Sequence, residues 1–112
     1  MPTFEAKAWN NGQHHPTGAG YRLQISRSDR DRHFIRSWRT VQLLGFGAGP
    51  ITVNIDKKSF WDPKCRELIS VHLGRWMIAQ KIGSWPHRKR PIITLIPKGS
   101  GIFQLHSYRL LP

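Results

Sequence analysis

The residues best placed to do chemistry in this sequence are Asp56 and Lys58, which follow the apolar run ITVNI. A carboxylate at the end of a strand can hold Mg²⁺, and a lysine two positions later can position water or stabilise charge on a phosphate. Such a centre needs a further carboxylate, and the sequence upstream offers Glu5, Asp29 and Asp31. The two aspartates stand among arginines, whose charge would weaken the affinity for a metal ion. A Mg²⁺-dependent nuclease using Asp56 and Lys58 is therefore an alternative, and we expect no metal site.

Histidine and cysteine give a weaker indication of catalysis. Four histidines, with arginines on the scissile phosphate, could supply the acid–base pair of a small basic RNA-cleaving toxin: His14, His15, His33 and His87. No Cys/His cluster with the spacing of a zinc site accompanies them. The single Cys65 needs a base to act as a nucleophile, and although His72 is close in the sequence, we expect Cys65 to be a plain thiol. We expect no catalytic residue, no cofactor and no enzymatic activity, with the RNA-cleaving toxin as an alternative.

Basic residues are the dominant chemical feature of the chain. Six arginines fall within eighteen positions: Arg22, Arg27, Arg30, Arg32, Arg36 and Arg39. The planar fork of arginine suits phosphates and guanine edges better than an ammonium group does. Helical ion pairs with Asp29 and Asp31 would leave most of these arginines unpaired. We therefore expect this segment to contact a polyanion.

Two further basic clusters follow. The second contains Lys57, Lys58, Lys64 and Arg66, and the third contains His87, Arg88, Lys89 and Arg90. Phe60 and Trp61 lie inside the second cluster, where an aromatic ring can stack on an unpaired base or anchor the loop in the core. We expect at least one of these two rings to be buried. We also expect Trp9, Trp38 and Trp76 to belong to the core.

The composition agrees with a nucleic-acid partner. The 112 residues carry 18 Lys and Arg against six Asp and Glu, a formal net charge of +12 that concentrates polyanions around the protein. No apolar run approaches the ~20 residues of a spanning helix, and the N-terminus MPTFEAKAW lacks the apolar stretch of a signal peptide. One cysteine cannot build a disulfide framework. We expect an intracellular protein, cytoplasmic or in the nucleoid or nucleus, with no membrane partner.

Apolar patterning predicts the strands that position these side chains. Alternation and β-branched content predict five of them, over residues 21–26, 39–46, 51–55, 91–97 and 101–108. Residues 98–101 are expected to form a hairpin turn, and residues 1–20 to be partly irregular.

Two helices are also predicted. The first is short, with Ser28 as N-cap and an apolar face made of Phe34, Ile35 and Trp38. The second begins after Ser70, ends at Gly83 and carries one face with helical spacing, formed by Leu73, Trp76, Met77 and Gln80. At this length the chain is one domain. Strand-rich order with one or two helices predicts a mainly β fold, a small open pseudobarrel.

The stretch SFWDPKCRELISVHLGRWMIAQKIG resembles the central part of the plant-type B3 DNA-binding domain. In that family an aromatic-Trp pair ends a strand, and a polar loop, a short strand and a helix carrying an aromatic follow. The matching segments here are Phe60-Trp61, residues 62–64, 66–69 and 70–82, and upstream LQISRSDRDRHF resembles the family's first strand and the Ser-Asp that opens its first helix. The resemblance spans about residues 21–106, although the family's Gly-Asp after the helix is replaced by residues 83–86. The same pseudobarrel is the DNA-recognition domain of EcoRII-like and BfiI-like restriction endonucleases.

The resemblance implies that two arms grip the major groove of duplex DNA, one over residues 27–39 and one over residues 57–66. We therefore expect a sequence-specific double-stranded DNA-binding domain, free-standing or part of a restriction or regulatory protein. Lysines would contact phosphates, while arginines and Asp62 or Asn54 would read base edges, with Ser59 as a further contact. An RNA-binding module is the alternative, because the phosphate backbone of RNA attracts the same positive charge.

Overall fold

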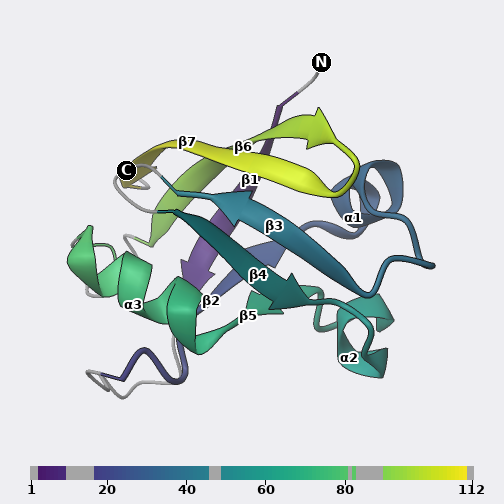
Figure 1. Ribbon diagram of the computed structural model, residues 1–112, viewed down its shortest axis with the longest axis horizontal. Coiled ribbons are helices and arrows are strands. Elements are labelled where there is room, and N and C mark those ends of the chain that lie inside the picture. Colours follow the sequence, from purple (N-terminus) through teal and green to yellow (C-terminus); the bar gives the residue numbers. More distant parts are fainter. Residues whose placement is uncertain (1–2, 10–16, 46–48, 81, 83–89, 111–112) are drawn as a thin grey trace.

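The structure is a computed structural model that describes residues 3–9, 17–45, 49–80, 82 and 90–110. Within these residues the chain forms seven strands and three helices (Figure 1). In chain order they are β1 (Phe4–Trp9), β2 (Arg22–Ile25), α1 (Arg27–His33), β3 (Thr40–Leu44), β4 (Pro50–Asn54), α2 (Lys58–Trp61), β5 (Glu67–Ile69), α3 (Val71–Ala79), β6 (Pro91–Gly99) and β7 (Ile102–Leu110).

All seven strands belong to one sheet, in the order β4-β3-β7-β6-β1-β2-β5. Neighbouring strands pair antiparallel, except that β3 and β7 run parallel. The sheet curls until its two end strands, β4 and β5, come into contact. The predicted mainly β pseudobarrel is therefore confirmed.

Alternation along the strands builds the core inside this curled sheet. Leu23, Leu43, Val53, Leu95 and Leu105 come from five different strands and are all fully buried. The strand neighbours of these residues point away from the core and are polar or partly exposed. The core is therefore filled by one face of each strand, as expected for a closed or nearly closed sheet.

The sequence analysis predicted no strand before residue 21, but Phe4–Trp9 form the strand β1. Phe4, Ala6 and Ala8 are buried while Glu5 and the other odd positions are exposed, so the segment alternates strictly. Two of its three inward residues are alanines, whose small apolar surface gives little sequence signal. Nevertheless β1 pairs with both β2 and β6 and lies inside the sheet order.

The exposure of Trp9 follows from the same alternation of buried and exposed residues. Trp9 occupies an outward position of β1 and is 36% exposed, so the expectation that it belongs to the core is wrong. Trp76 is buried and Trp38 packs against the core, as predicted.

Helix α1 begins earlier than its sequence suggests. Ser26, rather than Ser28, is the N-cap, and its Oγ accepts a hydrogen bond from the backbone N–H of Asp29 at 3.1 Å. The helix ends at His33, so Phe34 is buried outside it while Ile35 is 53% exposed. The predicted apolar helix face is therefore wrong.

Helix α3 agrees better with prediction. Ser70 is its N-cap, accepting from the backbone N–H of His72 and of Leu73. The apolar positions Leu73, Trp76 and Met77 are buried. The helix ends at Ala79, and the predicted terminator Gly83 lies outside the described residues.

The remaining elements complete the comparison. The predicted strands β2, β3, β4, β6 and β7 are confirmed, and the turn between the last two contains three consecutive residues with positive φ, Gly99, Ser100 and Gly101. The short strand β5 lies within residues 66–69, where the family resemblance placed a short strand. The placement of Phe60-Trp61 at the end of a strand is wrong, because β4 ends at Asn54 and both aromatic residues belong to α2.

Candidate nucleic-acid interface

Two basic segments come together at one end of the pseudobarrel. We call residues 26–39 the α1 arm and residues 54–66 the α2 arm. Both helices lie on the right in Figure 1, whereas α3 lies on the left. Three kinds of contact join the arms, and a fourth ties the base of the α2 arm to the end of β2.

Arg30 provides the first of these contacts. Its Nη1 donates to the backbone carbonyl oxygens of Phe60 at 3.1 Å and of Asp62 at 3.0 Å, and its Nε donates to the Asp31 carboxylate. Only 5% of Arg30 is exposed. The structure therefore corrects the expectation that every arginine of this cluster is available to a ligand. The guanidinium of Arg30 is buried and binds the backbone at α2 instead.

Trp61 is the second point of contact. Its indole Nε1 donates to the carbonyl oxygen of Ile55 at 2.9 Å, and its ring meets the fully buried Phe60 ring edge-on, with centroids 5.1 Å apart. The guanidinium carbons of Arg30 and Arg36 lie 5.5 and 5.3 Å from the indole centroid. The prediction that one ring of the Phe60-Trp61 pair is buried is confirmed.

Arg66 closes the base of the α2 arm. It has a φ of 50°, and its Nε donates to the carbonyl oxygen of Ile25 at 2.9 Å, while its own carbonyl accepts from the Ile25 N–H at 3.1 Å. Its Nη1 also donates to the carbonyl of Pro63. The side chain predicted to contact DNA is thus tied to the protein backbone.

A backbone contact completes the junction. The carbonyl oxygen of Arg39 accepts from the N–H groups of Ile55 and Asp56 at 2.9 and 3.1 Å. The start of the α2 arm is thereby fixed to the end of the α1 arm. Loops that carry binding residues are effective when a rigid scaffold holds them, and this junction supplies such a scaffold.

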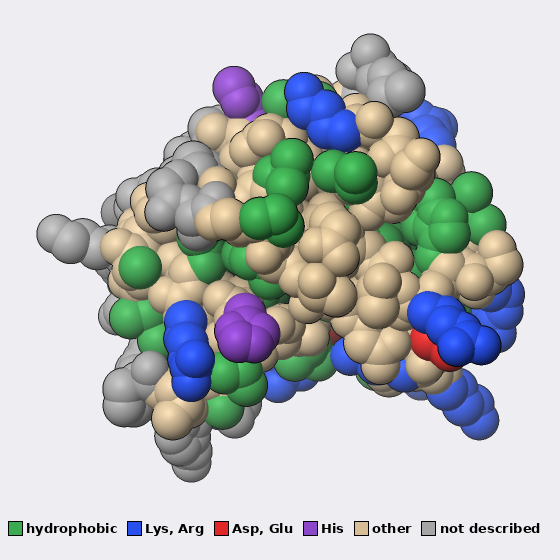
Figure 2. All heavy atoms as spheres, in the orientation of Figure 1, with side chains coloured by type: hydrophobic (Ala, Val, Ile, Leu, Met, Phe, Trp, Pro, Cys, Tyr) green, Lys and Arg blue, Asp and Glu red, His purple; other side chains and the backbone are tan. Residues whose placement is uncertain are grey.

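The cations that remain available share exposure and freedom from ion pairing. Within the described part of the chain none of them forms an ion pair: Arg27, Arg32, Arg36, Arg39, Lys58 and Lys64. Figure 2 shows Lys and Arg side chains gathered at the right, over α2. We call these six residues the exposed cations.

The polar residues of the α2 arm are mostly engaged locally. Asn54 is exposed, and its Oδ1 accepts from the Asp56 N–H at 2.8 Å. The Asp62 carboxylate accepts from the Lys64 N–H at 2.7 Å. Both side chains keep further hydrogen-bonding capacity, and Ser59 is exposed.

A cleft lies between the arms. It has a volume of about 280 Å³ and is lined by Arg36, Asp56, Lys57, Lys58 and Trp61. Three of its five lining side chains are cationic, one is a carboxylate and one is an aromatic ring. The cleft therefore combines charge attraction with a stacking surface.

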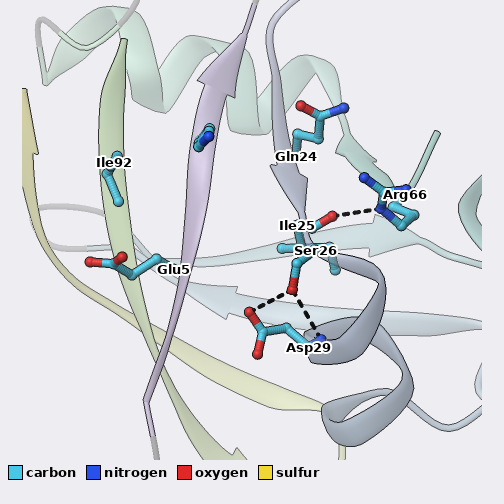
Figure 3. A pocket seen from close by; sticks show the side chains of 8 residues that line it. Glu5, Gln24, Ile25, Ser26, Asp29, Arg66 and Ile92 are labelled. Atoms are coloured by element: carbon cyan, nitrogen blue, oxygen red, sulfur yellow. Dashed lines mark hydrogen bonds between the residues drawn. The ribbon is translucent and has the colours of Figure 1, made fainter. Parts of the chain in front are cut away.

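A second hollow, of about 320 Å³, lies on the outer face of β1 and β2 (Figure 3). Glu5 and Asp29 line this hollow, together with Arg66, whereas Asp56 lines the cleft. Figure 3 shows Asp29 hydrogen-bonded to Ser26 beside the start of α1. Two of the three carboxylates that could complete a Mg²⁺ site at Asp56 thus line another hollow, and the third, Asp31, accepts a hydrogen bond from Arg30. Among the described residues, no group of three His, Cys, Asp or Glu side chains could hold a metal ion.

Arg22 and Arg90 lie away from the arms. Arg22 donates to the Glu67 carboxylate at 3.2 Å and stands over the Trp9 ring at 4.5 Å. Arg90 donates to the carbonyl of Ala8, and its burial lowers the pKa of its guanidinium while Glu67 acts to raise it. The structure thus separates these two arginines from the exposed cations.

Two side chains considered for acid–base or nucleophilic catalysis, His33 and Cys65, lie in the described part of the chain. His33 is half-buried and stacks on Phe4, with ring centroids 4.5 Å apart. Cys65 is a half-buried free thiol. The other histidines of the RNA-cleaving hypothesis and two cations of the third basic cluster lie outside the described residues: His14, His15, His87, Arg88 and Lys89.

Which arginines are buried and which are exposed could not be predicted from the sequence. Arg30 and Arg32 are two positions apart on α1, yet one is buried and the other exposed. Helical periodicity places them on different faces, but only the packing partner at α2 determines which face is inside. No sequence signal identified that partner.

Among the described residues, no helix has the length and apolar character needed to cross a membrane.

Comparison with known proteins assigns no family or function to the chain. No protein-family model, curated protein or solved structure matches the chain.

Proposed function

We propose that this chain is a sequence-specific DNA-binding domain that holds duplex DNA with its α1 and α2 arms. The observation that carries the proposal is the buried Arg30, which ties the two arms together and leaves the exposed cations facing outward from both. Two segments far apart in the sequence thereby form one basic surface.

The charge of this surface favours a polyanion. The exposed cations have no described ion-pair partner, so binding a phosphate breaks no ion pair among the described residues. Cations of this kind supply most of the affinity for a nucleic-acid backbone, through release of counterions. Lys58 and Lys64 would contact phosphates, and arginines such as Arg32 would read base edges.

Rigid coupling of the arms favours a duplex. A duplex presents phosphates and base edges at fixed spacings, so a rigid pair of arms can match it without losing flexibility on binding. The likeness to the B3 domain remains a prediction, and the pseudobarrel with basic segments after β2 and β4 is the feature that supports it.

The test is selection from a randomised duplex pool, with a matched single-stranded RNA pool, followed by sequencing of the bound molecules. The control variant is Arg75→Ala, which removes an exposed arginine from α3 at the other end of the molecule. We expect a consensus from the duplex pool that Arg75→Ala retains. Equal binding of both pools without a consensus would overturn sequence-specific DNA recognition, and enrichment from the RNA pool alone would favour an RNA-binding module.

A further inference from the structure

The cleft between the arms is lined by an aromatic ring and a carboxylate, and binding a paired duplex does not require either group. Its lining combines the Trp61 ring, the Asp56 carboxylate and the cations Arg36, Lys57 and Lys58. At about 280 Å³ it lies just below the range for small-ligand sites, roughly 300–1,000 Å³. Its size therefore suits one nucleotide rather than a longer segment.

Trp61 forms a fixed stacking platform at this cleft. The hydrogen bond from its Nε1 to the Ile55 carbonyl and its edge-on contact with Phe60 both hold the ring in one orientation. Stacking on an aromatic side chain is available to any base that is not already stacked and paired within a duplex. The Arg36 guanidinium stands over the ring at 5.3 Å from its centroid, and because Arg36 is exposed it can move away and cover a base that stacks there. The buried Arg30, 5.5 Å from the same centroid, stays in place.

Asp56 supplies the hydrogen-bonding specificity. Its backbone N–H is held by the Arg39 carbonyl and the Asn54 side chain, so its position is fixed. Its carboxylate is exposed and forms no ion pair with any described residue. An ionised carboxylate only accepts hydrogen bonds, and its two oxygens can accept two parallel ones.

Guanine is the base that matches this acceptor pair. Its Watson–Crick edge presents two adjacent donors, N1–H and the N2 amino group, whereas that edge of each other base presents its donor beside an acceptor. In a duplex the guanine edge is occupied by cytosine, so the base must be unpaired to meet Asp56. Lys57 and Lys58 line the same cleft and can neutralise the nucleotide's phosphate.

We propose that the cleft binds an unpaired guanine, stacked on Trp61 and hydrogen-bonded to Asp56. This proposal rests on the nucleic-acid binding proposed above and specifies one base that the surface would capture. A bulge, an overhang or a free nucleotide would present the same chemistry.

The first experiment compares DNA hairpins that carry one bulged guanine, one bulged adenine or no bulge, by fluorescence anisotropy. We expect the guanine bulge to bind about tenfold more tightly than either other hairpin, the size of one good bidentate contact. Asp56→Asn should remove this preference and leave binding of the fully paired hairpin intact. Glu5→Gln is the matched control, because it makes the same change in charge at an exposed carboxylate of β1 outside the cleft and should retain the preference.

The second experiment follows the Trp61 indole N–H by NMR during titration with guanosine or adenosine monophosphate. The resonance is assigned by its loss in Trp61→Phe, and we expect the guanosine nucleotide alone to shift it. Equal binding of the three hairpins together with no selective shift would overturn the guanine site while the duplex-binding proposal stands. A guanosine-specific shift without binding of any hairpin would support the site and overturn the duplex-binding proposal.

Discussion

Arg30 on α1 donates a hydrogen bond to the carbonyl oxygen of Asp62, beyond the end of α2, at 3.0 Å. The same Nη1 reaches the Phe60 carbonyl, and the residue is almost completely buried. A buried guanidinium needs partners to offset its desolvation, and here two backbone carbonyls and the Asp31 carboxylate provide them. Arg30 is therefore the buried side chain among the contacts that hold the two arms in place, beside the Arg36–Trp61 contact and the hydrogen bonds accepted by the Arg39 carbonyl.

Arg30→Ala is expected to destabilise the fold. The substitution leaves the carbonyls of Phe60 and Asp62 without their donor and removes packing beside Trp61, so we expect a loss of about 3 kcal/mol in the free energy of unfolding. Urea unfolding followed by circular dichroism measures it.

Arg32→Ala is the matched control for Arg30. It lies on the same helix but is exposed, so its effect on stability should stay within about 0.5 kcal/mol. At temperatures where both variants are folded, Arg32→Ala should weaken DNA binding more than Arg30→Ala does, because Arg32 would contact the DNA directly. Equal stability of the two variants would contradict the role of Arg30 as the tether between the arms.

Salt dependence provides the second prediction. If the five exposed cations other than Arg32 contact phosphates of B-DNA, the logarithm of the affinity should fall with the logarithm of salt concentration with a slope of about −4.5. Removing one phosphate contact, as in Lys58→Ala, should reduce the slope by about 1. Anisotropy titrations over a salt series measure both values.

Arg75→Ala serves as the comparison for this series. It makes the same change in net charge as Lys58→Ala but removes an exposed side chain of α3. Its slope should equal that of the unmodified protein. If Arg75→Ala and Lys58→Ala lower the slope equally, the charge acts through the whole molecule and no localised interface exists.

The sequence predicted the elements whose side chains alternate clearly or have a strong cap. Helix α3 was predicted because Ser70 precedes a well-spaced apolar face, and the β6–β7 hairpin because glycines tolerate positive φ between apolar strands. Strand β1 was missed because alanine packs inside a sheet as well as a larger residue when neighbouring side chains fill the space. That compensation is a tertiary effect and leaves no local signal.

The positive charge of the candidate interface could be predicted from the sequence, but the arrangement of its side chains could not. The clustering of arginines and lysines along the chain was sufficient to identify both arms. Which cation faces outward depends on long-range partners, and Arg66 illustrates this because its guanidinium binds the Ile25 carbonyl, 41 residues earlier. The cleft at Trp61 likewise lies where the two arms meet, with Arg36 from the α1 arm and the other lining residues from the α2 arm.

Gly74→Ala tests the packing of α3. Gly74 is buried, and a methyl group on it would overlap the carbonyl group of Gly18, which itself has a φ of +88°. Alanine would favour an isolated helix by about 1 kcal/mol, but overpacking a tight contact costs about 1–3 kcal/mol. We expect a net loss of stability, measured as a lower Tm, whereas the exposed His72→Ala on the same helix should leave Tm nearly unchanged. A higher Tm for Gly74→Ala would show that the segment around Gly18 does not pack on α3 in solution.

Base reading and phosphate contact give different signatures in the last prediction. Arg32→Ala should lose about 1–3 kcal/mol of discrimination at one base position and relax the consensus there, because an arginine fork binds a guanine edge through two hydrogen bonds. Lys64→Ala should weaken binding to all sequences alike, since a phosphate carries no base identity.

Sequencing the duplexes bound by each variant from one randomised pool separates these signatures. A consensus that loses information at a single position in Arg32→Ala and is unchanged in Lys64→Ala would assign the two roles. If every exposed-cation variant weakens all sequences uniformly, the arms contact only the backbone. Sequence specificity would then have to come from DNA shape or be lacking altogether.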